Sequence, residues 1–299
     1  MFQHTIQQEF SVFGKGLHTG LHLRAVFKPA PVGSGIRICR VDLPQRPSVP
    51  ALAEYVCSTE RGTVLADGEC CVSTVEHAMS ALSAMGVDNC QIEVDGPEMP
   101  ILDGSAREYV EKIAVVGLAE QNERREYLEI KEPVVMENPQ TGSWLRLEPS
   151  ESFSAEVEIE FHSPVLGCQK ANLASMYDYS EEIASARTFC FVREIEPLLQ
   201  KGYIKGGDLK NAIVIYDEPL TQEQFDMLAS NLSQQIHREA SELGYLTPLL
   251  FDNEPARHKL LDLIGDLALV GKPLKAHVTA YKPGHGSNTL FAKQLRERG

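Results

Sequence analysis

The sequence predicts an α+β protein, a duplicated two-domain layered β/α sandwich in which each unit combines a sheet with helices. The chain has 299 residues, about twice the size of a common domain. Each half contains alternating segments typical of strands and a helical segment that carries a histidine. The charged run NERRE, near residues 122–127, separates the halves. We therefore expect domains over residues 1–124 and 125–299, with a functional site at the interface between them.

The pattern of apolar residues places the individual elements. β-Branched content and alternation predict strands over residues 21–27, 35–41, 89–94, 127–137, 144–147, 155–161 and 274–281. A period near 3.6 predicts helices over residues 74–85, 222–243 and 255–270, the last ending before Gly271. In both halves a histidine-bearing helix precedes a strand and a Gly/Pro loop, which indicates a duplicated unit. Residues 189–216 follow the order strand, helix, Gly-Gly turn, strand, and predict a βαβ insertion.

Composition excludes several classes of protein. The 28 basic and 42 acidic residues give a net charge of −14, which argues against a nucleic-acid partner. No apolar stretch approaches the roughly 18 residues of a membrane-spanning helix. The N-terminus lacks the basic and apolar regions of a secretory signal, so we expect a cytoplasmic protein without integral membrane contact. The seven cysteines form no CxxC pair and are expected to be reduced.

A polar stripe marks the helix predicted over residues 255–270. His258, Asp262 and Asp266 recur every four residues and therefore lie on one face, among leucines that indicate burial. A histidine and a carboxylate one turn apart can ligate one metal ion. A mutually hydrogen-bonded His/Asp pair or a solvated face explains the short HxxxD pattern equally well.

Two further histidines have the surroundings of functional residues. His77 follows Glu76 in STVEHAMSAL, where it could supply a third metal ligand beside a proton-accepting carboxylate. Spacing alone favours the alternative that Ser73 and Glu76 form a helix-capping box. His285 lies in the glycine-flanked loop PGHGSN, where a catalytic acid and a surface turn are both common. Proximity to Asp266 would raise the pKa of His285.

The predicted insertion follows the segment SARTFCF, and its apolar residues have two interpretations. They could form a local core, the usual meaning of such a pattern, or an apolar tunnel for an acyl chain. The residues concerned are Phe189, Phe191, Ile195, Leu198, Ile204, Ala212 and Val214.

Seven ordered segments together resemble a known family. They are GKGLHTG, TVEHAMSAL, DNCQIEVDGPEMPILDGSA, SARTFCF, KGGDLKNAIV, ARHKLLDLIGDLALVG and AYKPGHGSN. In this order they resemble the zinc-dependent UDP-3-O-acyl-N-acetylglucosamine deacetylases of lipid A biosynthesis. The resemblance runs from about residue 5 to residue 293.

The resemblance implies a reaction and a metal. The reaction is hydrolysis of the 2-acetamido group of UDP-3-O-(3-hydroxyacyl)-N-acetylglucosamine, which gives acetate and a free amine. It implies one catalytic Zn²⁺ per chain, and Fe²⁺ is compatible with the same ligands. The implied ligands are His77, His258 and Asp262.

The resemblance also assigns the remaining site residues. It implies that Glu76 is the general base, that Thr188 and His285 stabilise the oxyanion, and that Asp266 holds the ring of His285. The implied substrate contacts are Lys259, with Lys282 as a second candidate, for the diphosphate, Glu160 and Phe161 for uracil, and Leu17, Phe189, Ile195, Ile204, Ala212 and Val214 for the acyl chain.

Departures from the family pattern leave a second hypothesis open. Cys190 replaces a usual glycine, and basic residues near Ser143 are missing. The long segment before residue 255 resembles versions fused to a 3-hydroxyacyl-carrier-protein dehydratase, which is therefore an expected fused or associated partner. The alternative to the deacetylase is a catalytically silent domain of the same fold that binds a nucleotide-sugar.

Overall fold

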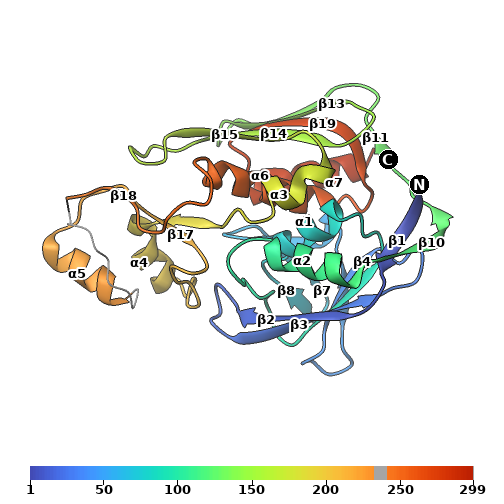
Figure 1. Cartoon of the computed structure of the whole chain (residues 1–299), viewed down its shortest axis with the longest axis horizontal. Helices are drawn as coiled ribbons and strands as arrows, with labels where there is room; N and C mark the ends of the chain where they lie inside the picture. Colours follow the sequence, from blue (N-terminus) through green and yellow to red (C-terminus); the bar gives the residue numbers. More distant parts are fainter. Residues whose placement is uncertain (232–240, 299) are drawn as a thin grey trace.

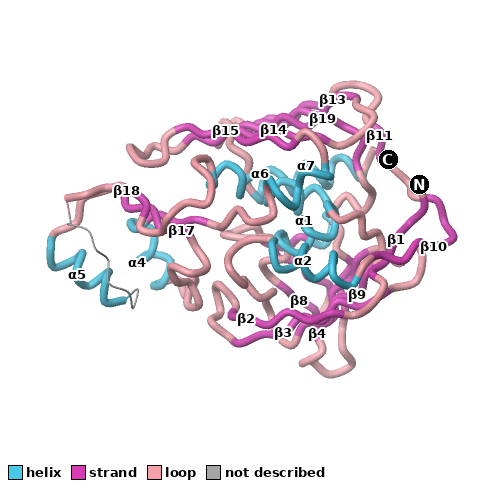
Figure 2. Tube along the Cα trace, in the orientation of Figure 1, coloured by secondary structure: helices cyan, strands magenta, loops and turns pink. Residues whose placement is uncertain are grey.

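The computed structural model describes residues 1–231 and 241–298, which form two outer sheets with helices between them (Figures 1 and 2). One sheet has the strand order β2 (Phe10–Lys15), β3 (His22–Pro29), β9 (Cys90–Val94), β4 (Ile36–Arg40) and β5 (Ser48–Pro50). The other has the order β12 (Val134–Asn138), β13 (Ser143–Pro149), β19 (Leu274–Tyr281), β14 (Ser154–Glu160) and β15 (Cys168–Leu173), and β11 (Leu128–Glu129) pairs with β19.

The two sheets have the same topology. In the first, β9 is antiparallel to β3 and parallel to β4. In the second, β19 is antiparallel to β13 and parallel to β14. The inner helices correspond too: α1 (Glu76–Ala84) precedes β9 as α6 (Glu254–Ala268) precedes β19. The predicted α+β class and duplication are thus confirmed, while the domain boundary after residue 124 stays a prediction.

Buried apolar and more exposed polar residues alternate along β14, which gives this sheet an apolar face to pack on the inner helices. Val157 and Ile159 are 2% and 1% exposed, whereas Glu156 on the opposite face is exposed. A sheet with one face against the core and the other in water is expected to show this pattern. The apolar faces of both sheets and the helices α1, α2 (Arg107–Val116), α6 and α7 (His285–Arg296) contribute to one continuous core.

Smaller elements extend this framework. β1 (Phe2–Ile6) pairs with β10 (Leu118–Arg124), and β6 (Val56–Ser58), β7 (Val64–Asp67) and β8 (Cys70–Val72) form a separate sheet. The predicted βαβ insertion is observed as β16 (Phe189–Phe191), α4 (Val192–Gln200) and β17 (Ile213–Tyr216), to which β18 (Gly244–Tyr245) is added. The remaining elements are the 3₁₀ helices Ala53–Tyr55 and Met176–Asp178, α3 (Tyr179–Glu182) and α5 (Gln222–Asn231).

Three sequence-based element predictions differ from the structure. The strand expected over 127–137 is divided into β11 and β12, and Pro133 between them has no N–H for strand pairing. The helix expected over 222–243 is α5 up to Asn231; residues 232–240 lie outside the described part, and 241–243 are not helical. Helix α7 was not predicted. Among the described residues, no helix is long and apolar enough to cross a membrane.

Gly265 sets the distance between the two central helices. A Cβ atom at this position of α6 would lie 2.1 Å from the backbone oxygen of Glu76 on α1. Real carbon atoms do not approach an oxygen this closely, so the helices can touch here only because residue 265 has no side chain. This contact brings the head of α1 beside the polar stripe of α6.

We expect Gly265→Ala to lower the free energy of unfolding by about 3 kcal/mol, because overpacking against a backbone atom forces the helices apart. Urea unfolding of the purified variant measures the change. Gly284→Ala is the matched control, since a Cβ at residue 284 meets nothing within 4 Å. Equal stability of the two variants would contradict this account of the helix crossing.

Candidate metal centre and active site

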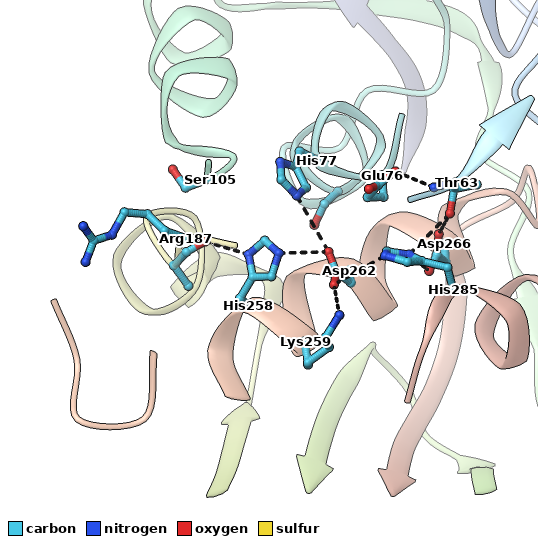
Figure 3. Close-up of polar contacts among 12 residues, drawn as sticks. Thr63, Glu76, His77, Ser105, Arg187, His258, Lys259, Asp262, Asp266 and His285 are labelled. Carbon is cyan, nitrogen blue, oxygen red and sulfur yellow. Dashed lines mark hydrogen bonds and ion pairs between the residues drawn. The ribbon is translucent and has the colours of Figure 1, made fainter. Parts of the chain in front are cut away.

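Two imidazoles and one carboxylate converge where α1 meets α6 (Figure 3). His77 Nε2 lies 3.8 Å from Asp262 Oδ1, and His258 Nε2 lies 3.3 Å from the same oxygen. One ligand atom from each of the three residues lies within 4.8 Å of the other two. All three side chains are buried. The structure therefore brings together the three residues that the resemblance implied as metal ligands.

Hydrogen bonding leaves these atoms free to bind an ion. His258 Nδ1 is 3.0 Å from the carbonyl oxygen of Ala186, to which it can only donate, so Nε2 keeps its lone pair. Asp262 Oδ1 is buried, and no group of the described residues forms a hydrogen bond with it. A buried polar atom without a partner is costly, and a cation between it and the two imidazoles would satisfy it.

The local electrostatics favour the protonation states that a metal needs. Burial lowers the pKa of His77 to about 3, and burial also lowers the pKa of His258. For Asp262 burial raises the pKa, but the neighbouring basic groups, first His258 and then Lys259 and His285, hold the pKa below the usual value. Neutral imidazoles and an ionised carboxylate form a donor set that fits Zn²⁺ or Fe²⁺.

Glu76 is a buried carboxylate beside this cluster. Its Oε2 accepts a hydrogen bond of 2.9 Å from the amide of Thr63, and burial raises its pKa to about 7. Ser73 does not cap the helix with it, since the Ser73 hydroxyl donates instead to the carbonyl of Pro97. The capping-box interpretation is therefore wrong, because α1 begins at Glu76 and the carboxylate points to another segment.

His285 lies on the other side of the cluster. It is the first residue of α7 and its side chain is 12% exposed, so the surface-turn interpretation is wrong. Its Nδ1 is 3.0 Å from Asp266 Oδ2, and its Nε2 is 3.8 Å from Asp262 Oδ2. Burial alone would lower the pKa of His285, but the carboxylates of Asp266 and Asp262 raise it to about 9. The expected effect of Asp266 is confirmed.

These groups open into one cavity of about 470 Å³. Leu17, Thr188, Phe189, Lys259 and Lys282 also line it, as the resemblance implied for all five. Lys259 Nζ is 2.8 Å from Asp262 Oδ2. A further set of polar lining residues was not identified from the sequence, because they come from unrelated loops and one hairpin: Thr59, Arg61, Asn138, Thr141 and Ser143.

Thr188 is fixed by its backbone and by its neighbour. Its amide donates to the carbonyl of Gly104, and its own carbonyl accepts from the amide of Ile213. Arg187 makes three hydrogen bonds with the fully buried carboxylate of Glu254. These contacts hold the Thr188 side chain at the wall of the cavity.

The two residues implied for uracil lie next to the cavity rather than in its lining. Glu160 accepts a hydrogen bond from the hydroxyl of Tyr281 and lies 3.1 Å from Lys282 Nζ. Phe161 packs against Phe189, with ring centroids 5.6 Å apart. Both residues therefore contact a residue of the lining, and their binding role stays a prediction.

The remaining acyl-chain residues lie in the insertion and are not part of the lining of this cavity. Val214 belongs to a separate small core against which Ile195 packs. Ala212 is buried, and Ile204 has a positive φ of 50° in the turn before Gly206. The local-core interpretation describes Ile195 and Val214, and the passage role of all four residues stays a prediction.

One residue that sequence reasoning missed joins Glu76 to Asp266, the partner of His285. Thr63, which is fully buried, bonds to Glu76 through its amide. Its hydroxyl donates to Asp266 Oδ1 at 2.5 Å. No motif surrounds Thr63, and its partner Asp266 is 203 positions away in the chain, so the sequence carries no signal for this contact.

A cluster of two histidines and an aspartate, flanked by a buried glutamate and a histidine paired with a carboxylate, is an arrangement typical of metal-dependent hydrolases. The comparison with protein families agrees with this class. The family model for UDP-3-O-acyl N-acetylglycosamine deacetylase matches residues 3–229 and 227–297. The chain belongs to this family.

Individual relatives agree. The chain is 52% identical over 297 residues to the "Bifunctional enzyme LpxC/FabZ" of Porphyromonas gingivalis, covering 99% of this chain and 64% of that protein. It is 40% identical over 297 residues to the UDP-3-O-acyl-N-acetylglucosamine deacetylase of Myxococcus xanthus, with coverage of 98% and 86%. The protein of the same name from Nostoc sp. is 38% identical over 302 residues, with coverage of 99% and 98%. The chain thus spans about 64% of the bifunctional relative.

Proposed function

We propose that this chain removes the acetyl group from the 2-acetamido nitrogen of UDP-3-O-(3-hydroxyacyl)-N-acetylglucosamine, a step of lipid A biosynthesis. The observation that carries this proposal is the convergence of His77, His258 and Asp262 in one cavity with Glu76 and His285. Membership of the deacetylase family supports the choice of substrate.

His77, His258 and Asp262 would hold one Zn²⁺ per chain, and Fe²⁺ suits the same ligands. When bound, such an ion lowers the pKa of a water molecule and polarises a carbonyl oxygen. Asp262 Oδ1 supports this assignment, because this buried atom has no hydrogen-bond partner within residues 1–231 and 241–298.

The flanking residues then move protons. Glu76 accepts a proton from the water that adds to the amide carbon, and its bond from Thr63 fixes the carboxylate for this role. His285, oriented through Nδ1 by Asp266, presents Nε2 to the cavity. As a cation it stabilises the oxyanion together with the hydroxyl of Thr188. The C–N bond breaks, the nitrogen takes the Nε2 proton of His285, and acetate and the free amine leave.

The rest of the cavity provides groups for the other parts of the substrate. Lys259 and Lys282 are cations on its wall that suit a diphosphate, and Leu17 and Phe189 provide apolar surface for an acyl chain. Glu160 and Phe161, which contact Lys282 and Phe189, are proposed to meet uracil.

The bifunctional names of relatives support a second enzyme, a 3-hydroxyacyl-carrier-protein dehydratase, as a fused or associated partner. Such a partner is proposed here on those names and on the sequence pattern. A cytoplasmic location stays a prediction.

Acetate release from acylated and unacylated UDP-N-acetylglucosamine tests this function. We expect hydrolysis of the acylated substrate with kcat/KM at least about 100-fold higher, since burying only four methylene groups is worth about 3 kcal/mol. The silent-domain hypothesis predicts no acetate from either compound. Comparable rates with both compounds would instead indicate an amidase that does not recognise the acyl chain.

A further inference from the structure

Thr63 lies between Glu76 and the pair formed by Asp266 and His285, all of which the proposed reaction needs. It lies in the loop between β6 and β7, outside the helices that carry the metal cluster. Its amide donates to Glu76 Oε2 over 2.9 Å, and its carbonyl accepts from the amide of Val75 at the head of α1. The backbone of Thr63 therefore holds the carboxylate of Glu76 in place.

The hydroxyl of Thr63 contacts Asp266 and His285 rather than Glu76. It donates to Asp266 Oδ1 at 2.5 Å and lies 3.4 Å from His285 Nδ1. A hydroxyl has one proton, so the contact with His285 requires that Nδ1–H donates to the hydroxyl oxygen as well as to Asp266 Oδ2. The Thr63 hydroxyl oxygen and Asp266 Oδ2 both accept from Nδ1, so Nδ1 stays protonated. The other ring nitrogen, Nε2, is left to face the cavity.

The second oxygen of Asp266 has its own partners. Asp266 Oδ2 accepts from the side-chain amide of Asn288 at 2.9 Å and from His285. In the described part of the chain, Thr63 is the one residue that hydrogen-bonds to Oδ1. Without the hydroxyl, this fully buried carboxylate would lose the contact that fixes its rotation, and the ring of His285 would lose its anchor.

Gly62, the residue before Thr63, lets the loop lie close to the carboxylate of Glu76. A Cβ at residue 62 would be 3.1 Å from Glu76 Oε1, so the loop and the carboxylate are already in close contact. The loop that contains Gly62 and Thr63 therefore binds Glu76 through a backbone amide and Asp266 through the hydroxyl of Thr63.

We propose that Thr63 is a positioning residue that couples the proton acceptor Glu76 to the proton donor His285 across the active site. The inference rests on the proposed deacetylase function. The proposed role belongs to the hydroxyl of Thr63. The hydrogen bond from the backbone amide of residue 63 to Glu76 can form with any residue except proline at this position.

The test compares Thr63→Val, Thr63→Ala and Thr63→Ser with the unchanged chain. Val has the same shape without the hydroxyl, Ala cannot introduce a clash, and Ser keeps the hydroxyl. We expect Val and Ala to lower kcat by about 10- to 100-fold, the usual cost of losing such an outer contact, with KM within about twofold. Ser is expected to retain kcat within about threefold.

Two further measurements exclude a merely structural role. Metal content per chain is expected to stay unchanged in all variants, because the side chain of Thr63 bonds to Asp266 and His285 and not to a proposed ligand. In proton NMR the Nδ1–H signal of His285 is expected far downfield in the unchanged chain and the Ser variant, and lost by exchange in Val and Ala. Thr5→Val is the matched control: it removes another buried hydroxyl, which accepts from the amide of Ala30, and should leave kcat unchanged.

Each outcome decides the question. If the unchanged chain releases no acetate, the proposed function fails, and the NMR signal alone tests the role of Thr63. An active enzyme in which Val or Ala retains full kcat, or in which Ser loses as much as Val, overturns the proposal. If Val and Ala do not fold, a Ser variant without the downfield signal or with low kcat also overturns it.

Discussion

Glu76→Gln is expected to lower kcat for deacetylation by about 10²- to 10⁴-fold, the usual contribution of a general base. The amide keeps the shape of the side chain and can still accept from Thr63, so the fold should be maintained. It cannot take a proton from water. Steady-state acetate release measures the loss, and metal analysis of the same sample should find the ion content of the unchanged chain.

Glu93→Gln is the control for this variant. Glu93 pairs with Lys28 at 2.8 Å on the first sheet, far from the cavity lining, and its loss should not affect kcat. If Glu76→Gln keeps more than a tenth of the original kcat, Glu76 is not the group that accepts the proton. The carboxylate would then serve only to satisfy the Thr63 amide.

Asp262→Ala is expected to remove both the metal and the activity. Asp262 is the only anionic member of the ligand set, and the cation of Lys259 lies 2.8 Å from its Oδ2. Its removal leaves two imidazoles beside an unpaired ammonium group, an environment that repels a divalent ion. We expect zinc affinity to fall by more than about 100-fold, beyond the cost of losing an outer-shell partner.

Calorimetric titration with zinc and metal analysis after dialysis measure this change. Asp88→Ala is the control. Asp88 is also a mostly buried carboxylate, it forms an ion pair of 2.8 Å with Arg125, and it does not line the cavity. A variant at residue 262 that binds zinc as tightly as the control would contradict the ligand assignment.

The buried polar face of helix α6 could be predicted from the sequence because periodicity reports it directly. His258, Asp262 and Asp266 recur every four residues, and α6 places all three on a buried face. The sheet strands were also predictable, since alternation in β14 and β19 matches their buried faces. Helix α7 was missed because Gly284 and Gly286 around His285 suggest a turn, whereas Gly284 lies just before its first residue.

What the sequence could not provide is long-range geometry. Whether Glu76 caps its helix or faces the cavity depends on Thr63, which comes from a separate loop. Spacing therefore favoured the wrong alternative for Ser73. The apolar residues of the insertion show the same limit: Val214 and Phe189 have similar patterns, yet Val214 packs in a small local core and Phe189 lines the cavity.

The most direct test of the central claim is anomalous diffraction at the zinc edge from crystals grown with zinc. We predict one strong peak per chain between His77 Nε2, His258 Nε2 and the carboxylate of Asp262, with ligand distances of about 2.0–2.2 Å. A map without a peak at these three residues, or with the ion held elsewhere, would contradict the account.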